Sequence, residues 1–161
     1  MSDVILYTTD DGKIKIDLQL KDGTVWLSQL QIADLFQTSK QNISKHIKAI
    51  YEDEELEESA TVNQQLTVQK EGSREVSRTL VLYNLDMILA VGYRVRSARG
   101  VEFRRYASTV LKEYLEKGFA MNDDRLKNLG GGNYWKELLD RIRNIRSSEK
   151  VMYRQVLDLY A

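Results

Sequence analysis

The sequence contains no cysteine and no proline, and it has a single histidine, His46. Without cysteine the chain has no disulfide, no thiolate metal ligand and no catalytic thiol, and one histidine excludes a metal site built from several imidazole groups. No apolar run approaches the roughly 20 residues of a membrane-spanning helix. The N-terminus also lacks the basic and apolar segments of a secretory signal. We therefore expect a cytoplasmic protein that binds no membrane.

The charges sum to zero, but they are unevenly distributed along the chain. Residues 1–58 carry 6 basic and 12 acidic side chains, residues 59–120 carry 10 and 6, and residues 121–161 carry 8 and 6. The zero total argues against a general nucleic-acid coat. A neutral protein with one basic face can still bind DNA, because binding depends on the local potential.

Alternating polar and apolar residues predict two β-rich segments. In the first, residues 4–20 form two strands around the hairpin-turn sequence at 10–12, and residues 24–27 add an extended piece. In the second, residues 61–83 form a longer hairpin whose basic tip, residues 70–74, contains a glycine.

Between these segments, residues 27–51 have the pattern of two short helices joined by a tight turn. Ser28 and Thr38 each have a glutamine three residues on, which is the capping-box signal for a helix start. The second helix has an apolar stripe and a polar, basic outer face. This layout is typical of a helix-turn-helix, whose second helix enters the DNA major groove. Gln37 replaces the usual turn glycine, so a left-handed Gln37 would cost roughly 1–2 kcal/mol.

Downstream of the second hairpin, Asn84 is expected to cap a helix over residues 85–91, and a stronger helix over 101–117 ends at Gly118. Apolar residues over 133–160 then follow a heptad-like pattern that Glu149 interrupts. This seam fits either self-association or packing on the rest of the chain, and we favour the first.

The predicted fold class is α+β, with an N-terminal β-hairpin region, a winged helix-turn-helix, a helical pair and a long C-terminal helix. The expected domains are a DNA-binding domain at residues 1–120, a glycine-containing flexible connector at 121–132, and a long oligomerisation helix at 133–161.

The outer face of the second predicted helix has the chemistry to read DNA. Glutamine and asparagine pair with adenine at two points, and lysine and serine bind guanine or phosphate. The candidates at the helix are Ser39, Lys40, Gln41, Asn42, Ser44, Lys45 and Lys48, with Lys40, Gln41, Asn42 and Ser44 as base readers. Lys45, Lys48, Lys70 and Arg74 are expected phosphate contacts. An ordinary helical hairpin with a polar face is the alternative.

Five arginines lie within twelve residues and are opposed only by Glu102; they are Arg94, Arg96, Arg99, Arg104 and Arg105. A planar guanidinium group binds two phosphate oxygens at once, which makes this cluster a candidate phosphate site. The alternative is ion pairing to the acidic segment 52–58 or to a partner chain. The acidic segment itself lacks the ligand spacing of a calcium loop, so we interpret it as solvated.

Several stretches of the chain carry a resemblance to a known family. The most specific are Val-Gly-Tyr-Arg-Val at residues 91–95 and Arg-Gly-Val-Glu-Phe-Arg at 99–104. The other stretches are residues 25–29, 42–48, 83–88 and 133–139. Together they resemble the RhuM virulence-protein family of bacteria. The segment 103–106 is also similar to the N-terminal domains of phage antirepressors, whose role is DNA binding.

The resemblance implies a bacterial, mobile-element setting and a DNA-binding role, and it supplies no catalytic residues. The sequence offers no nucleophile paired with a base and no metal cage, so we expect neither enzymatic activity nor a cofactor. The expected function is binding of double-stranded DNA as a transcriptional regulator or antirepressor, in a homodimer formed through the C-terminal helix. The alternative is a protein-interaction module that uses the arginine cluster and that helix without binding DNA.

Overall fold

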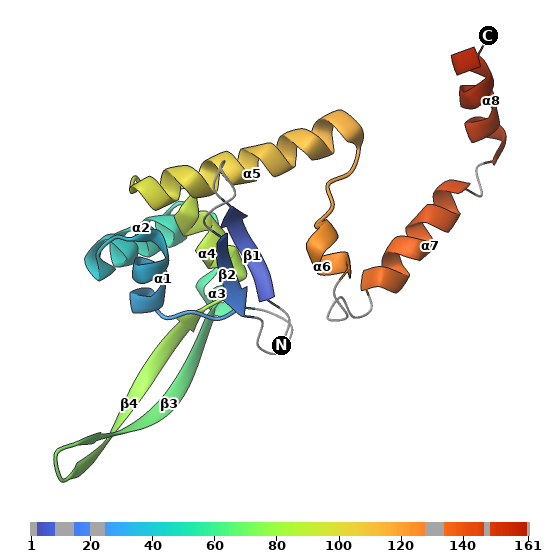
Figure 1. Cartoon of the computed structure of the whole chain (residues 1–161). Helices are drawn as coiled ribbons and strands as arrows, with labels where there is room; N and C mark the ends of the chain where they lie inside the picture. The colour runs from blue at the N-terminus through green and yellow to red at the C-terminus, as the bar shows by residue number, and fades with distance from the viewer. Residues whose placement is uncertain (1–2, 9–14, 20–24, 128–133, 147–148, 161) are drawn as a thin grey trace. The chain divides into compact units, whose positions relative to one another are not determined.

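The computed structural model describes residues 3–8, 15–19, 25–127, 134–146 and 149–160 (Figure 1). The chain divides into two compact units, Met1–Ala120 and Met121–Ala161. Helices and antiparallel strands both occur in the first unit, so the fold class is α+β, as predicted.

The first unit begins with two antiparallel strands, β1 (Asp3–Thr8) and β2 (Lys15–Gln19). The turn predicted at residues 10–12 lies outside the described residues. β1 packs against helix α5 (Ala98–Lys117). The extended piece predicted at 24–27 is described from Val25 onward, and the backbone of Leu27 pairs with that of Tyr83 through N–O distances of 2.9 and 2.7 Å.

Helix α1 (Gln29–Phe36) starts as the sequence predicts. The backbone N–H of Gln31 donates to Oγ of Ser28 at 3.3 Å, and the Ser28 N–H donates to Oε1 of Gln31 at 2.8 Å. This reciprocal pair is the capping box. At its other end the helix stops at Gln37, which adopts the left-handed conformation (φ 54°, ψ 52°). The turn therefore has the left-handed geometry considered for Gln37, without a glycine.

Helix α2 (Lys40–Glu52) starts one residue later than predicted. Thr38 was expected to be the cap, but Ser39 is: its Oγ accepts from the backbone N–H of Asn42 at 3.1 Å. The reason is the left-handed Gln37. It folds the chain back so that the N–H of Thr38 still bonds the carbonyl of Ala33 at 2.9 Å, which assigns Thr38 to the end of α1.

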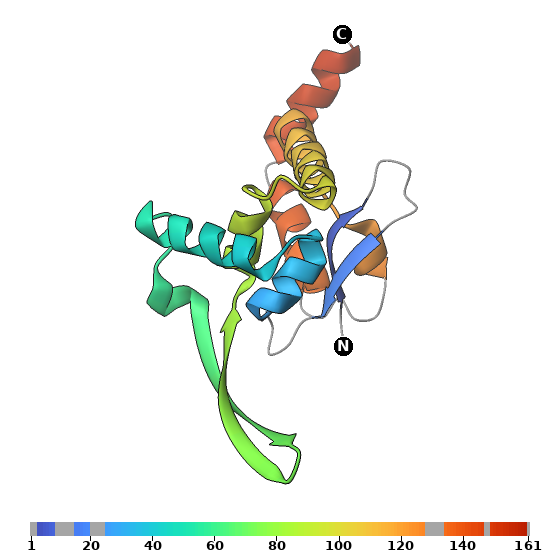
Figure 2. The ribbon, with the colours of Figure 1, turned by 90° about the vertical axis from the view of Figure 1, so that its left-hand side faces the viewer.

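A short helix, α3 (Glu58–Thr61), leads into a long hairpin of β3 (Val62–Glu71) and β4 (Arg74–Tyr83). The two strands pair antiparallel over their full length, from Val62 opposite Tyr83 to Glu71 opposite Arg74. Gly72, with φ 64°, occupies the first turn position, where a type II′ turn places glycine. Both strands extend further toward the tip than predicted, and the hairpin projects away from the helices of the first unit (Figures 1 and 2).

Helices α4 (Leu85–Gly92) and α5 complete the first unit. The caps predicted at Asn84 and Gly118 are confirmed: Oδ1 of Asn84 accepts from the Met87 N–H at 3.2 Å, and Gly118 ends α5 with φ 81°. α5 begins three residues before the predicted start, because Ser97 caps it.

The core lies where α1, α2, α4 and the first turns of α5 meet. Phe36 and Phe103 form an edge-to-face pair with ring centroids 5.8 Å apart. A Cβ atom on Gly92 would lie 2.5 Å from the ring of Phe103, so this contact needs glycine. The other large, fully buried apolar side chains are Val25, Ile32, Ile43, Ile50, Met87, Ile88, Val91 and Val95.

The second unit contains α6 (Asp123–Lys127), α7 (Tyr134–Arg146) and α8 (Glu149–Tyr160). The single helix expected over 133–160 is thus described as two helices, and residues 147–148 between them lie outside the described residues. α6 lies in the predicted connector, whose glycines at 130–132 also fall outside the description. Among the described helices, none combines the length and apolar character needed to cross a membrane.

Candidate nucleic-acid interface

Helix α2 separates its apolar and polar side chains onto opposite faces. Ile43, Ile47 and Ile50 are buried in the core. The exposed residues on the opposite side are Gln41, Ser44, Lys45 and Lys48, and Lys40 is also exposed at the start of the helix. Their spacing of three, four and seven residues places Gln41, Ser44, Lys45 and Lys48 along one stripe. No other described segment covers this stripe, which we call the outer face of α2.

Two further predicted site residues build the helix start. Oγ of Ser39 is used as the cap. Asn42 is half-buried, and its side-chain amide donates to Oγ1 of Thr38 at 2.9 Å. Both side chains therefore hold the turn between α1 and α2 in place, next to the outer face.

The same turn is anchored to the start of α5. Ser97 caps α5 by accepting from the Gly100 N–H at 3.1 Å, and its hydroxyl also donates to the carbonyl oxygen of Phe36 at the end of α1. One serine thus connects α1 to the arginine-containing segment. Ser97 is not among the residues that the sequence pattern predicts for the site, although a serine before a helical pattern is a known start signal.

The arginine cluster does not form one surface, and Arg94 shows why. Its Nη2 atom lies 2.9 Å from Oδ2 of Asp53 and 3.0 Å from Oε2 of Glu55. These two hydrogen bonds raise the pKa of the Arg94 guanidinium. For this residue the structure shows the ion pairing with the acidic segment that was the alternative to phosphate binding.

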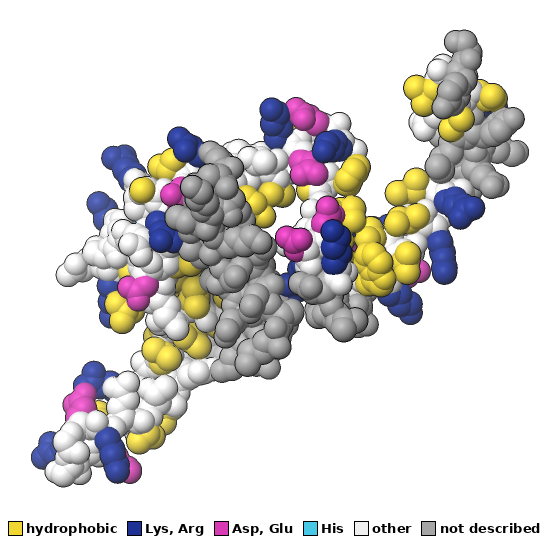
Figure 3. Space-filling model, viewed as in Figure 1, with side chains coloured by type: hydrophobic (Ala, Val, Ile, Leu, Met, Phe, Trp, Pro, Cys, Tyr) yellow, Lys and Arg dark blue, Asp and Glu magenta, His cyan; other side chains and the backbone are white. Residues whose placement is uncertain are grey.

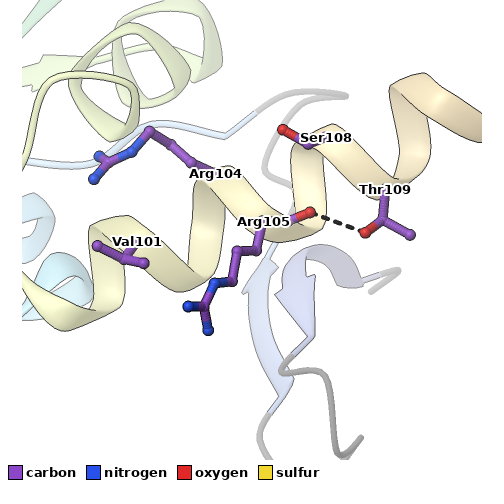
Figure 4. Close-up of a pocket in the computed structure, with 5 residues that line it drawn as sticks. All are labelled: Val101, Arg104, Arg105, Ser108 and Thr109. Carbon is purple, nitrogen blue, oxygen red and sulfur yellow. Dashed lines mark hydrogen bonds between the residues drawn. The ribbon is translucent and has the colours of Figure 1, made fainter.

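Arg104 and Arg105 follow each other along α5 but point in different directions (Figure 4). The guanidinium of Arg104 donates to the carbonyl oxygens of Gly92, at 3.2 Å, and Val95, which ties α5 to the end of α4. Arg105 is exposed, and it lines a shallow hollow on α5 with Val101, Arg104, Ser108 and Thr109. Arg104 is thus an internal brace of the fold.

Arg96 is the exposed arginine that lies on the side of α2. Burial lowers the pKa of the half-buried His46 in α2, and the positive charges of Arg94, Lys45 and Arg96 lower it further. The positive charges of Arg96 and Lys45 therefore both act on His46. Lys and Arg side chains gather along the edge of the molecule where α2 and the start of α5 lie (Figure 3). Arg99 is half-buried in the first turn of α5.

The hairpin tip places Lys70 and Arg74 in solvent, but among carboxylates. Lys70 is directly opposite Glu75 across the strands, and Arg74 is directly opposite Glu71. Glu71 also forms an ion pair with Arg78. Opposite charges in direct cross-strand positions attract each other, so the tip has a mixed charge, unlike the outer face of α2.

A comparison with models of protein families gives a match for this chain. The model described as the virulence protein RhuM family matches residues 60–161, which is more than half of the chain. The chain belongs to the RhuM family. The match begins after α2 and contains the hairpin, α4, α5 and the second unit, so the outer face of α2 lies outside the part that defines this RhuM membership. No match was found among curated proteins or among solved structures.

Proposed function

We propose that this RhuM-family protein binds double-stranded DNA by placing the outer face of α2 in the major groove. The observation that carries the proposal is the exposure of Gln41, Ser44 and Lys45 on the side of α2 opposite its buried isoleucines. An α-helix fits the major groove, and glutamine, serine and lysine can bond base edges there. Lys40 and the free carbonyl end of the Asn42 amide would add contacts at the helix start.

In this proposal α1, the left-handed turn at Gln37 and α2 form a helix-turn-helix, and the β3–β4 hairpin follows in the position of a wing. α1 and α2 pack on each other, and α2 packs on α4, which gives the second helix a rigid support. A site on helices that are held by a packed core is presented with a defined geometry.

Phosphate contacts are assigned to Lys45, Lys48 and Arg96, with Arg99 at the margin. Arg94 and Arg104 are excluded because their guanidinium groups already bind carboxylates and backbone carbonyls. The tip residues Lys70 and Arg74 are left out because Glu75 and Glu71 lie directly opposite them. Phosphate contacts by Lys70 and Arg74 therefore stay a prediction from the sequence and are not part of the proposal.

Self-association through the second unit is part of the proposal. α7 exposes a row of large apolar side chains, among them Trp135, Ile142 and Ile145, each at least half exposed. Such a face is rarely left in water and marks an interaction site. A two-fold dimer would present two α2 helices to two half-sites of a duplex, in a cytoplasmic regulator or antirepressor of a bacterial mobile element. The same apolar face favours the second candidate function, a protein-interaction module without DNA binding.

The test is DNA retention measured by fluorescence anisotropy over a range of salt concentrations. We expect binding that weakens as salt rises, because phosphate contacts release counterions. Ser44→Glu adds a carboxylate to the outer face and should abolish retention at moderate salt. Ser108→Glu makes the same change on exposed α5 and is the matched control. Absence of binding even at low salt, or equal loss in both variants, would contradict the proposal.

A further inference from the structure

The β3–β4 hairpin is long for an isolated pair of strands. Each strand has ten residues, so the hairpin spans roughly 33 Å at the usual rise per residue. Only its base joins the core, through the buried Tyr83 and the partly buried Val62 and Val81. Two-stranded sheets on their own are marginally stable in water. Leu66 and Val68 nevertheless point into solvent from the middle of β3, with exposed fractions of 74% and 63%.

The outer edge of β3 is open and unprotected. No described strand other than β4 pairs with β3, whereas the base of β4 is bridged to Leu27. Soluble proteins usually guard such an edge with charged residues or proline. From Val62 to Gln69, β3 contains neither, while β4 carries Arg74, Glu75 and Arg78. The pattern leaves one edge of the hairpin available for pairing.

We propose that this edge pairs antiparallel with β3 of a second copy of the chain, giving a four-stranded sheet in the order β4, β3, β3 and β4. Leu66 and Val68 are two residues apart, so they share one face of the strand. A two-fold axis perpendicular to the sheet places the same residues of the second copy on that face. Four apolar side chains then adjoin one another, and the open backbone groups of both β3 strands are bonded.

The charges favour a second copy in this orientation. Antiparallel pairing lays the tip of each hairpin beside the base of the other hairpin. The exposed charges of the tip are Lys70, Arg74 and Arg78 against Glu71 and Glu75, so the tip has a net charge of +1. The exposed carboxylates Glu57 and Glu58 lie next to that base, and neither forms an ion pair with a described residue. Parallel pairing would instead bring tip against tip. The uncharged middle of β3 also puts no like charges opposite each other.

This interface does not depend on the proposed DNA binding, and it is separate from the apolar face of α7. It gives the hairpin a role in assembly. A failure of DNA binding would leave it standing, and a failure of strand pairing would leave the outer face of α2 unaffected.

The absence of cysteine allows a direct test in the full-length chain. Single variants Gln64→Cys, Leu66→Cys and Val68→Cys are oxidised at micromolar concentration, and covalent dimers are quantified by denaturing electrophoresis. The residue nearest the two-fold axis faces its own copy with Cα atoms about 4.5–5.5 Å apart, which suits a disulfide. We expect one of the three positions to cross-link at least tenfold faster than Thr79→Cys, which pairs with Leu66 but lies on β4.

A second measurement does not require a new bond. Leu66→Lys places a charge on the open edge, and Thr79→Lys places the same charge at its partner position on β4. Sedimentation equilibrium should show the dimer dissociation constant raised at least tenfold by the first change and little affected by the second. The inference is overturned if no β3 cysteine cross-links faster than the β4 control, or if both lysine variants behave alike.

Discussion

The outer face of α2 and the arginine cluster both carry basic side chains, but the fold uses them differently. On α2 the lysines alternate with buried isoleucines, so packing the core forces the basic side chains outward. In the cluster, Arg94 turns to the acidic segment and Arg104 turns to the carbonyls at the end of α4. Density of basic residues in a sequence is therefore a weaker indicator of a binding surface than their position relative to an apolar stripe.

The largest expected effect comes from removing charge on the α2 side of this comparison. Lys45→Ala with Lys48→Ala should weaken DNA binding on the order of tenfold or more at moderate salt, and lower the salt slope by about 2. Anisotropy titrations measure both quantities. Because the two side chains are exposed, thermal unfolding should change little. An unchanged salt slope would show that these lysines touch no phosphate.

The opposite result is expected on the arginine side. Arg104→Ala leaves the carbonyls of Gly92 and Val95 without their donor, which should lower the free energy of unfolding by about 1–3 kcal/mol. Chemical denaturation measures this loss. The DNA affinity of the folded variant should stay at the wild-type value. A variant with an unchanged free energy of unfolding but weak DNA binding would show that Arg104 belongs to the DNA interface and does not stabilise the fold.

Arg94 should become able to bind phosphate once the acidic segment no longer holds it. Asp53→Asn with Glu55→Gln removes both carboxylates that hold Arg94. The released guanidinium lies near His46 on the α2 side, so DNA affinity should rise about two- to tenfold and the salt slope should steepen by about 1. Adding Arg94→Ala to the pair should cancel the gain. A gain that persists in the triple variant would mean that the carboxylates act by general repulsion.

The smallest expected effect concerns His46. Its pKa in the folded state is lowered, chiefly by burial and then by Arg94, Lys45 and Arg96. Below pH 6.5, the ordinary pKa of histidine, His46 therefore binds a proton more readily in the unfolded chain than in the folded one. The contribution of neutral His46 to the free energy of unfolding is intact above pH 6.5 and is lost as the pH falls through the folded-state pKa. Denaturation at several pH values should show this decrease, and His46→Gln should flatten it.

The sequence was a good guide where a local signal decides the structure. Caps at Ser28, Asn84 and Gly118 depend on residues within one helical turn, and each was found in its expected place. The predicted start of α2 is wrong by one residue. Thr38 and Ser39 can both cap a helix, and the left-handed turn at Gln37 decides in favour of Ser39.

Contacts between distant segments could not be predicted in this way. Arg94 and Asp53 are 41 residues apart, and Ser97 and Phe36 are 61 apart, so no periodicity links them. The sequence predicts that α5 begins at residue 101, directly after Gly100, whereas the helix begins at Ala98. A Cβ atom on Gly100 would lie 2.3 Å from the carbonyl oxygen of Val95, so the glycine lets the first turn of α5 pack closely against the segment before it.

The central claim is that the outer face of α2 lies against a duplex, and tethered cleavage tests it most directly. An iron chelate attached at Lys40→Cys, in full-length protein bound to a duplex selected from a random pool, should cut the DNA at a few discrete positions facing one major groove. The same chelate at Lys112→Cys on exposed α5 should cut weakly and without a pattern. Equal cutting from both positions, or none from position 40 on bound DNA, would contradict the claim.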